Sequence, residues 1–156
     1  DPRVRRFRTF SEAYGLAGLR LCYAIGHVDV IKAIDRIRNH FGVTRLGQLA
    51  GLAALSDQDH LAKVVSQVAA ARSAIAAIAQ DNGLHPLAPA ANFVAIDCGK
   101  DGEHARRVLE ALLSRGIFVR KPGVAPLDRC IRVTAGTDAD LAILAKELPA
   151  AIAAAG

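Results

Sequence analysis

Ser11 is a residue whose type could do covalent chemistry, because a serine hydroxyl beside a histidine acts as a nucleophile in hydrolases. The sequence has no G-x-S-x-G turn of the kind that exposes such a serine. Its histidines are scattered without metal-ligand spacing, which predicts no metal site: His27, His40, His60, His85 and His104. A recruited ester or lactone hydrolase therefore stands as one alternative function.

A more specific pattern surrounds this serine. Residues 9–20 read T-F-S-E-A-Y-G-L-A-G-L-R and resemble the T-x-S-K-x-x-x-L-A-G-L-R segment of fold-type I pyridoxal-phosphate aminotransferases of the histidinol-phosphate type. In that family the lysine forms an imine with the cofactor, and the nearby hydroxyls and the arginine hold the cofactor phosphate. The resemblance gives Thr9, Ser11 and Arg20 this cofactor-binding role. Their chemistry suits it, because a phosphate dianion is bound by short donors and a planar guanidinium.

A second segment with the same resemblance lies far downstream. Residues 130–137 read C-I-R-V-T-A-G-T and are similar to the family's C-[IL]-R-[IV]-[ST]-x-G-T segment, whose arginine binds the substrate α-carboxylate. Arg132 inherits that substrate-binding role by resemblance, and Asn92 and Phe93 match a strand start that borders the same site. Residues 116–120 (G-I-F-V-R) match a strand between the two. The segments follow the family order across nearly the whole chain.

The resemblance also implies an architecture and ligands. We expect an α/β protein in which residues 1–70 are a remnant of the cofactor-binding large domain and residues 71–156 form the small C-terminal α/β domain. Pyridoxal 5'-phosphate is the implied cofactor, an amino acid and a 2-oxo acid are the implied substrates, and a homodimer or higher assembly is the expected state.

Three departures from the family change the expected chemistry. Glu12 occupies the position of the Schiff-base lysine, and a carboxylate cannot form an imine or act as the amine base. The family's N-terminal half, which supplies the groups that contact the cofactor ring, does not precede residue 1. A strand that is apolar in the family carries Arg5, Arg6 and Arg8 here. This predicts that the strand lies at the edge of a sheet, is exposed to water or contacts a partner. We therefore expect no covalent cofactor and no transamination; a non-catalytic assembly or phosphate-binding module is the second alternative.

The elements that position these residues follow from apolar spacing and capping residues. Strands are predicted at 3–10, 19–25, 92–98, 117–120 and 130–134. Helices are predicted at 27–39, 44–55, from Ser56 or Asp57 to 81, from Asp101 to Gly116, and from Thr137 onward. Asp140 is placed to complete a capping box with Thr137.

Composition limits the remaining function classes. The 156 residues are 52% hydrophobic and 22% charged, as in an ordinary globular protein. The net charge of +5 is spread along the chain, so no nucleic-acid partner is expected. No uninterrupted apolar run reaches membrane-spanning length. Cys22, Cys98 and Cys130 are expected to be buried free thiols, which favours a cytoplasmic location.

Overall fold

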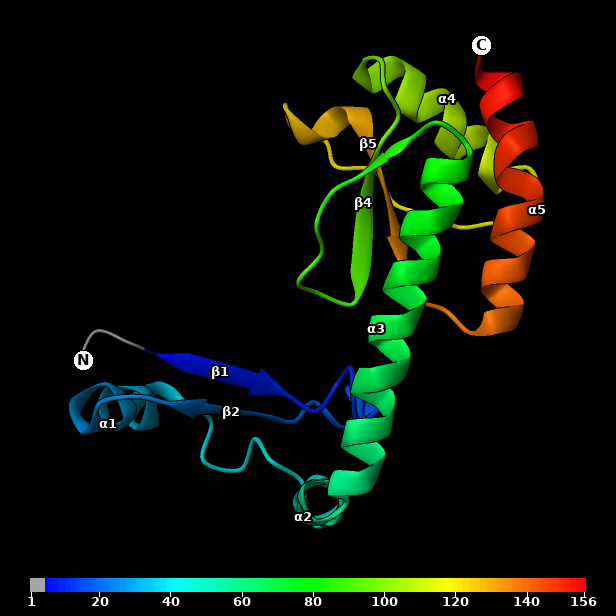
Figure 1. Ribbon diagram of the computed structural model, residues 1–156. Helices are drawn as coiled ribbons and strands as arrows, with labels where there is room; N and C mark the ends of the chain where they lie inside the picture. The colour runs from blue at the N-terminus through cyan, green and yellow to red at the C-terminus, as the bar shows by residue number, and fades with distance from the viewer. Residues whose placement is uncertain (1–4) are drawn as a thin grey trace. The chain divides into compact units, whose positions relative to one another are not determined.

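The computed structural model describes residues 5–156 and divides the chain into two compact units. Unit 1 comprises Asp1–Val65 and unit 2 comprises Ser66–Gly156. Figure 1 shows the strand pair β1–β2 and helices α1 and α2 in unit 1, and the sheet with helices α4 and α5 in unit 2. The mixture of strands and helices is the predicted α/β class. The functional assignment of residues 1–70 and 71–156 stays a prediction.

Unit 1 is built on a short antiparallel ladder. Strand β1 (Arg6–Thr9) pairs with β2 (Cys22–Ile25), so that Arg8 lies opposite Tyr23 and Thr9 opposite Cys22. The 3-10 turn η1 (Ala17–Leu19) lies between the strands. His27 caps the start of helix α1 (Val28–Ile37). Thr44 caps the start of α2 (Arg45–Ser56), and its hydroxyl accepts a hydrogen bond from the Gly47 amide at 3.0 Å.

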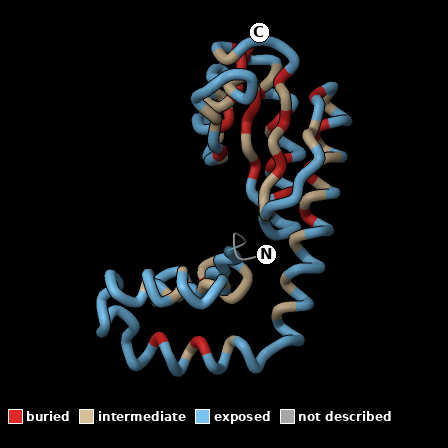
Figure 2. The backbone as a smooth tube through the Cα atoms, turned by 90° about the vertical axis from the view of Figure 1, so that its left-hand side faces the viewer, coloured by how far each residue is buried: buried red, intermediate tan, exposed pale blue. Residues whose placement is uncertain are grey.

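Very little of unit 1 is buried. Among its described residues only Phe10, Gly47 and Gly51 are buried, and the tube in Figure 2 shows the contrast with the buried strands of unit 2. Helix α2 is apolar on several faces, yet Leu46, Leu49, Leu52 and Leu55 are exposed. A helix that is apolar all round is ordinarily covered. Unit 1 alone therefore leaves its apolar groups in water.

Helix α3 (Gln58–Asp81) connects the units. Asp57, not Ser56, caps it, because the Asp57 carboxylate accepts from the His60 amide at 3.0 Å. Gly83 ends it in the left-handed region at φ +72°, as the C-cap pattern predicts. By length and composition alone α3 could cross a membrane, with 11% of its most apolar window buried. However, Ala71, Ile75 and Ala79 belong to the core of unit 2.

Unit 2 contains an antiparallel sheet in the order β3 (His85–Pro86), β4 (Phe93–Asp97) and β5 (Cys130–Thr134). Val94 pairs with Val133 and Ile96 with Ile131, and these four side chains are buried. Alternate residues of a strand point to opposite faces. One face of the sheet therefore packs into the core with α3, α4 and α5, and the other carries Phe93, Ala95 and Arg132.

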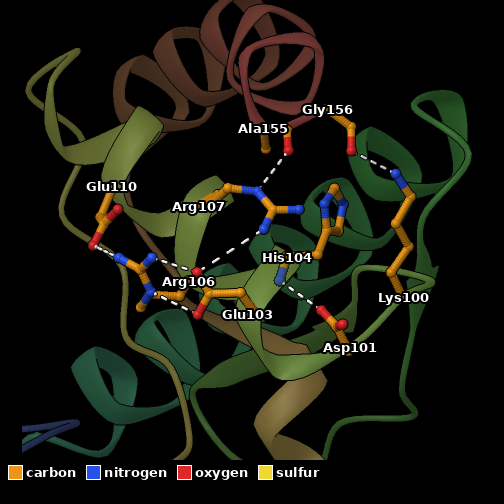
Figure 3. Close-up of polar contacts among 9 residues, drawn as sticks. All are labelled: Lys100, Asp101, Glu103, His104, Arg106, Arg107, Glu110, Ala155 and Gly156. Carbon is orange, nitrogen blue, oxygen red and sulfur yellow. Dashed lines mark hydrogen bonds and ion pairs between the residues drawn. The ribbon is translucent and has the colours of Figure 1, made fainter.

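Helices α4 (Gly102–Leu113) and α5 (Asp138–Ala155) complete this core. The predicted caps are confirmed: Asp101 accepts from the His104 amide at 2.8 Å, and Thr137 forms a capping box with Asp140. Helix α5 continues through Pro149. Figure 3 shows Arg107 of α4 donating to the Ala155 carbonyl of α5 at 2.8 Å, which ties the two helices together.

Several expected elements differ in extent. Strand β1 begins at Arg6, and residues 3 and 4 of the predicted strand lie outside the described residues. The predicted strand over 19–25 is shorter, because Arg20 adopts a left-handed conformation at φ 53° and the ladder starts only at Cys22. Strand β3 was not predicted, since it is two residues long and contains Pro86.

The strand predicted at 117–120 is wrong. Only Arg120 forms a bridge, to Arg132 of β5. Pro122 follows two residues later and has no amide hydrogen with which to continue a ladder. The expectation of buried thiols is also wrong for Cys22, which is exposed, while Cys98 and Cys130 are buried.

Candidate functional site

In unit 1 the structure brings two of the predicted phosphate ligands together. Thr9 Oγ1 donates to Ser11 Oγ at 2.7 Å, and the Ser11 amide donates to Thr9 Oγ1 at 3.0 Å. The turn after Ser11 is closed by main-chain hydrogen bonds from Gly15 to Glu12 and from Leu16 to Phe10. Gly15 meets the turn's requirement for a positive φ of 65°. The two hydroxyls thus form one local group of donors.

Arg20 is held by its own loop. Its Nη1 donates to the Ala17 carbonyl at 2.7 Å, and its amide donates to the same oxygen at 3.3 Å. The side chain is exposed. A non-glycine residue in the left-handed region is uncommon and carries a strain of order 1 kcal/mol. The backbone conformation and the side-chain contact together fix where the Arg20 guanidinium lies.

Glu12 is exposed at the position where the motif predicts a lysine. It lies one residue after the Ser11 hydroxyl, on the turn that Gly15 closes. The Thr9, Ser11 and Arg20 donors fit a phosphate group. A carboxylate has no amine to condense with an aldehyde. The donor types of Thr9, Ser11 and Arg20 are those that a phosphate uses, and their role toward pyridoxal phosphate stays a prediction, whereas Glu12 has no amine for covalent attachment.

In unit 2 Arg132 is the centre of the second candidate site. It lies in the middle of β5, on the sheet face that points away from the core. Its Cζ lies 4.6 Å from the centroid of the Phe93 ring, and its Nε is buried without a hydrogen-bond partner. A cationic donor left in this state costs free energy unless a ligand or neighbour completes it. Arg132 thus has donor capacity that the protein does not use.

The backbone around Arg132 is fixed on both sides. Its amide donates to the Arg120 carbonyl at 2.6 Å and its carbonyl accepts from the Arg120 amide at 3.1 Å. Residues paired directly across an antiparallel ladder point to the same face. Arg120 therefore lies on the same face as Arg132, and two guanidinium groups share it. Asn92 borders this face through its carbonyl, which accepts from the Ala135 amide at 2.8 Å.

The structure also brings Phe93 and Arg120 next to Arg132. The sequence motif places Phe93 at the strand start that borders the site and assigns no ligand to Arg120. Both lie in segments that match the family pattern, at 92–93 and 116–120. Their proximity to Arg132 depends on the register of β4, β5 and the Arg120 bridge, and that register pairs residues far apart in the chain. The matched segments were the available signal, but only the structure relates them to Arg132.

Two further polar groups do not extend the site. Arg129 Nε donates to Asp97 Oδ1 at 2.8 Å at the far end of β4. His104 is buried at the start of α4 with Nδ1 lacking a partner, and Figure 3 places its ring below the end of α5. The described residues hold no group of three or more histidine, cysteine or acidic side chains that could bind a metal.

An open groove of about 610 Å³ lies in unit 1. Its lining is largely apolar and includes the exposed Cys22: Phe10, Leu21, Cys22, Tyr23, Gln48, Gly51, Leu52 and Leu55. Thr9, Ser11 and Arg20 do not line it. The groove is therefore a patch of exposed apolar surface, and it does not include the Thr9 and Ser11 hydroxyls.

Comparisons with known proteins agree with the motifs. The family model "Aminotransferase class I and II" matches residues 2–148. A histidinol-phosphate aminotransferase from Cupriavidus pinatubonensis is 37% identical over 86% of this chain and 36% of its own length. One from Methylococcus capsulatus is 41% identical over 83% of this chain and 34% of its own. The chain thus spans just over a third of these curated relatives.

A solved structure extends the match to the backbone. The histidinol-phosphate aminotransferase of Sinorhizobium meliloti, crystallised with pyridoxal-5'-phosphate, is 51% identical and superposes with a TM-score of 0.94. The match covers 99% of this chain and 42% of that one. Sequence motifs, family model and backbone all agree: the chain belongs to the class I and II aminotransferase family and resembles its histidinol-phosphate members.

Proposed function

We propose that this chain binds carboxylate and phosphate groups and does not transaminate by itself. The observation that carries the proposal is Arg132, whose guanidinium lies against the Phe93 ring on the sheet face away from the core, with its Nε unpaired. A planar guanidinium is suited to bidentate carboxylate binding. By family resemblance the carboxylate is that of an amino acid or a 2-oxo acid.

Glu12 supports the proposal that the chain does not transaminate by itself. Amino transfer in the family proceeds through a lysine amine, and this chain offers a carboxylate at that position. When bound, pyridoxal phosphate supplies an electron sink for the reaction. Thr9, Ser11 and Arg20 are proposed to hold its phosphate, and Asn92 to border the substrate. None of these residues replaces the missing amine.

Anion titration tests the first half. Succinate is added to the chain and binding is followed by calorimetry, with Arg132→Gln as the test variant and Arg106→Gln as the control. Arg106 is paired with Glu103 and Glu110 on the surface of α4, so its loss should leave binding unchanged. We expect Arg132→Gln to weaken succinate binding about tenfold or more. Equal affinity in wild type and Arg132→Gln would contradict the proposal.

The exposed apolar surface of unit 1 favours assembly as a second function. Leu46, Leu49 and Leu52 are each more than 60% exposed on one helix, beside the apolar groove. Apolar patches of this kind ordinarily mark interfaces. We therefore expect a homodimer or higher assembly. The free thiols Cys98 and Cys130 favour a cytoplasmic location. Light scattering should give at least twice the chain mass; a monomer at micromolar concentration would argue against assembly.

Recruited hydrolysis at Ser11 has less support. The Ser11 hydroxyl accepts from Thr9, and among residues 5–156 no hydrogen bond joins it to a histidine. Activated-ester hydrolysis should be the same in wild type and Ser11→Ala. A rate that falls in the variant would return this function to consideration.

A further inference from the structure

We propose that Phe93 is a positioning residue for Arg132, and that its aromatic face orients the guanidinium for a carboxylate. This inference rests on the proposed function, in which Arg132 is the carboxylate-binding group. Family resemblance places Phe93 at a strand start that borders the substrate site and gives it no role toward Arg132. The role follows from where the two side chains lie in unit 2.

The sheet register brings the two residues together. Phe93 pairs with Thr134, and Arg132 pairs with Ala95. Phe93 and Ala95 are two residues apart on β4 and point to the same face, so Phe93 and Arg132 are diagonal neighbours on that face. The Arg132 Cζ lies 4.6 Å from the ring centroid. This distance is within the range in which a ring quadrupole attracts a cation.

Several other arginines of unit 2 have acidic partners. Arg106, Arg115 and Arg129 each form an ion pair with an aspartate or glutamate. For Arg132, no ion pair with an acid is present among residues 5–156. Its cross-strand neighbour Arg120 carries the same charge, which repels. The Phe93 ring is therefore the attractive contact for the Arg132 guanidinium on this face.

The chemical difference between these two kinds of partner matters for binding. A carboxylate partner would neutralise the guanidinium and occupy the N–H groups that a substrate carboxylate needs. An aromatic face attracts the charge without supplying an oxygen acceptor. Because the backbone of Arg132 is already fixed by Arg120, the ring has only the side-chain torsions to restrain. Phe93 thus pre-orders the group and leaves its donors to the ligand.

The variants Phe93→Leu and Phe93→Tyr test this role. Leucine removes the ring, whereas tyrosine retains it. Phe118→Leu is a matched control, because Phe118 is 74% exposed and also in unit 2. Succinate is titrated into the full chain, and the Arg132 Nε–H resonance, identified by its loss in Arg132→Gln, is followed by nuclear magnetic resonance.

We expect Phe93→Leu to weaken succinate binding about threefold to tenfold, while Phe93→Tyr and Phe118→Leu stay within about twofold of wild type. In an Arg132→Gln background, Phe93→Leu should have no further effect. Wild-type affinity in Phe93→Leu would overturn the inference, as would an equal loss in Phe93→Tyr. Failure of the proposed function is recognised separately, because Arg132→Gln would then bind as wild type does.

A fluorinated ring separates positioning from packing and does not depend on the leucine variant folding. Trifluorophenylalanine incorporated at position 93 keeps the ring shape but withdraws the negative charge from its face. We expect succinate binding to weaken and the Arg132 Nε–H resonance to broaden, with the thermal midpoint unchanged. Unaltered binding and an unaltered resonance would show that the ring acts only by packing, which overturns the inference.

Discussion

Arg129 Nε donates a 2.8 Å hydrogen bond to Asp97 Oδ1 and joins the end of β4 to the start of β5. Burial opposes ionisation of Asp97, but the Gly99 amide and the Arg129 guanidinium outweigh it, so the pKa of Asp97 is lowered from 3.8. The Asp97 side chain is 20% exposed and the Arg129 side chain is 43% exposed. The pair thus joins the end of β4 to the residue that precedes β5.

This pair predicts a loss of stability in acid. Because the folded-state pKa lies below the unfolded value, the Asp97 carboxylate contributes stability above about pH 4 that disappears as the pH falls through the folded-state pKa. We expect the free energy of unfolding in urea to be about 1 kcal/mol higher for wild type than for Asp97→Asn at neutral pH. In acid the two free energies of unfolding should converge. A difference that is independent of pH would contradict this assignment.

A side chain at Gly116 should lower stability through backbone strain and not through a steric clash. It has a φ of +79°, and a Cβ placed there would meet nothing within 4 Å. Gly116→Ala should therefore destabilise the chain by about 1 kcal/mol through backbone strain alone. Gly123→Ala is the control, because its Cβ would also lie in open space and its φ is ordinary. Equal unfolding midpoints for the two variants would be inconsistent with strain at Gly116.

The cysteines predict different thiol reactivities. Cys22 is exposed, whereas Cys98 and Cys130 are buried. Burial raises the pKa of Cys98 to about 11, which keeps it protonated and unreactive near neutral pH. Maleimide should label Cys22 first, and Cys22→Ser should abolish the fast phase. Slow labelling of Cys22 in the native protein, made fast by dilution, would instead locate the assembly interface at the groove.

Restoring the lysine should not restore the enzyme. In Glu12→Lys an amine follows the Ser11 hydroxyl, but the chain spans only 42% of the Sinorhizobium relative. By family resemblance, the groups that contact the cofactor ring lie in the part of that relative that these 156 residues do not match. We expect no amino transfer by Glu12→Lys with added pyridoxal phosphate, measured against Glu12→Gln. Measurable turnover by the lysine variant alone would show that these residues form a more complete site.

The parts of the fold that local chemistry determines were predictable from the sequence. Asp101 and Thr137 were recognised as caps because a capping residue acts within its own first turn. The strand predicted at 117–120 was wrong because the prediction rested on apolar residues alone. Only Arg120 forms a bridge, and Pro122 has no amide hydrogen with which to extend the ladder. Exposure of Cys22 was not predictable either, since it depends on how little of unit 1 packs over β2.

The candidate site divides in the same way. Thr9, Ser11, Arg20 and Arg132 were identified by motif, because each matches a family segment that is continuous in sequence. Phe93 and Arg120 acquire their relation to Arg132 only through strand register. That register is set by the whole core, so residue spacing along the chain could not reveal the contact.

An assay for amino transfer tests directly whether this chain transaminates by itself. Wild-type chain is mixed with pyridoxal phosphate, an amino acid donor and a 2-oxo acid, and the new amino acid is measured against cofactor without protein. We expect no product above that background, because Glu12 stands where the amine is needed, even when succinate binding at Arg132 is intact. Product that increases with protein concentration would contradict this expectation.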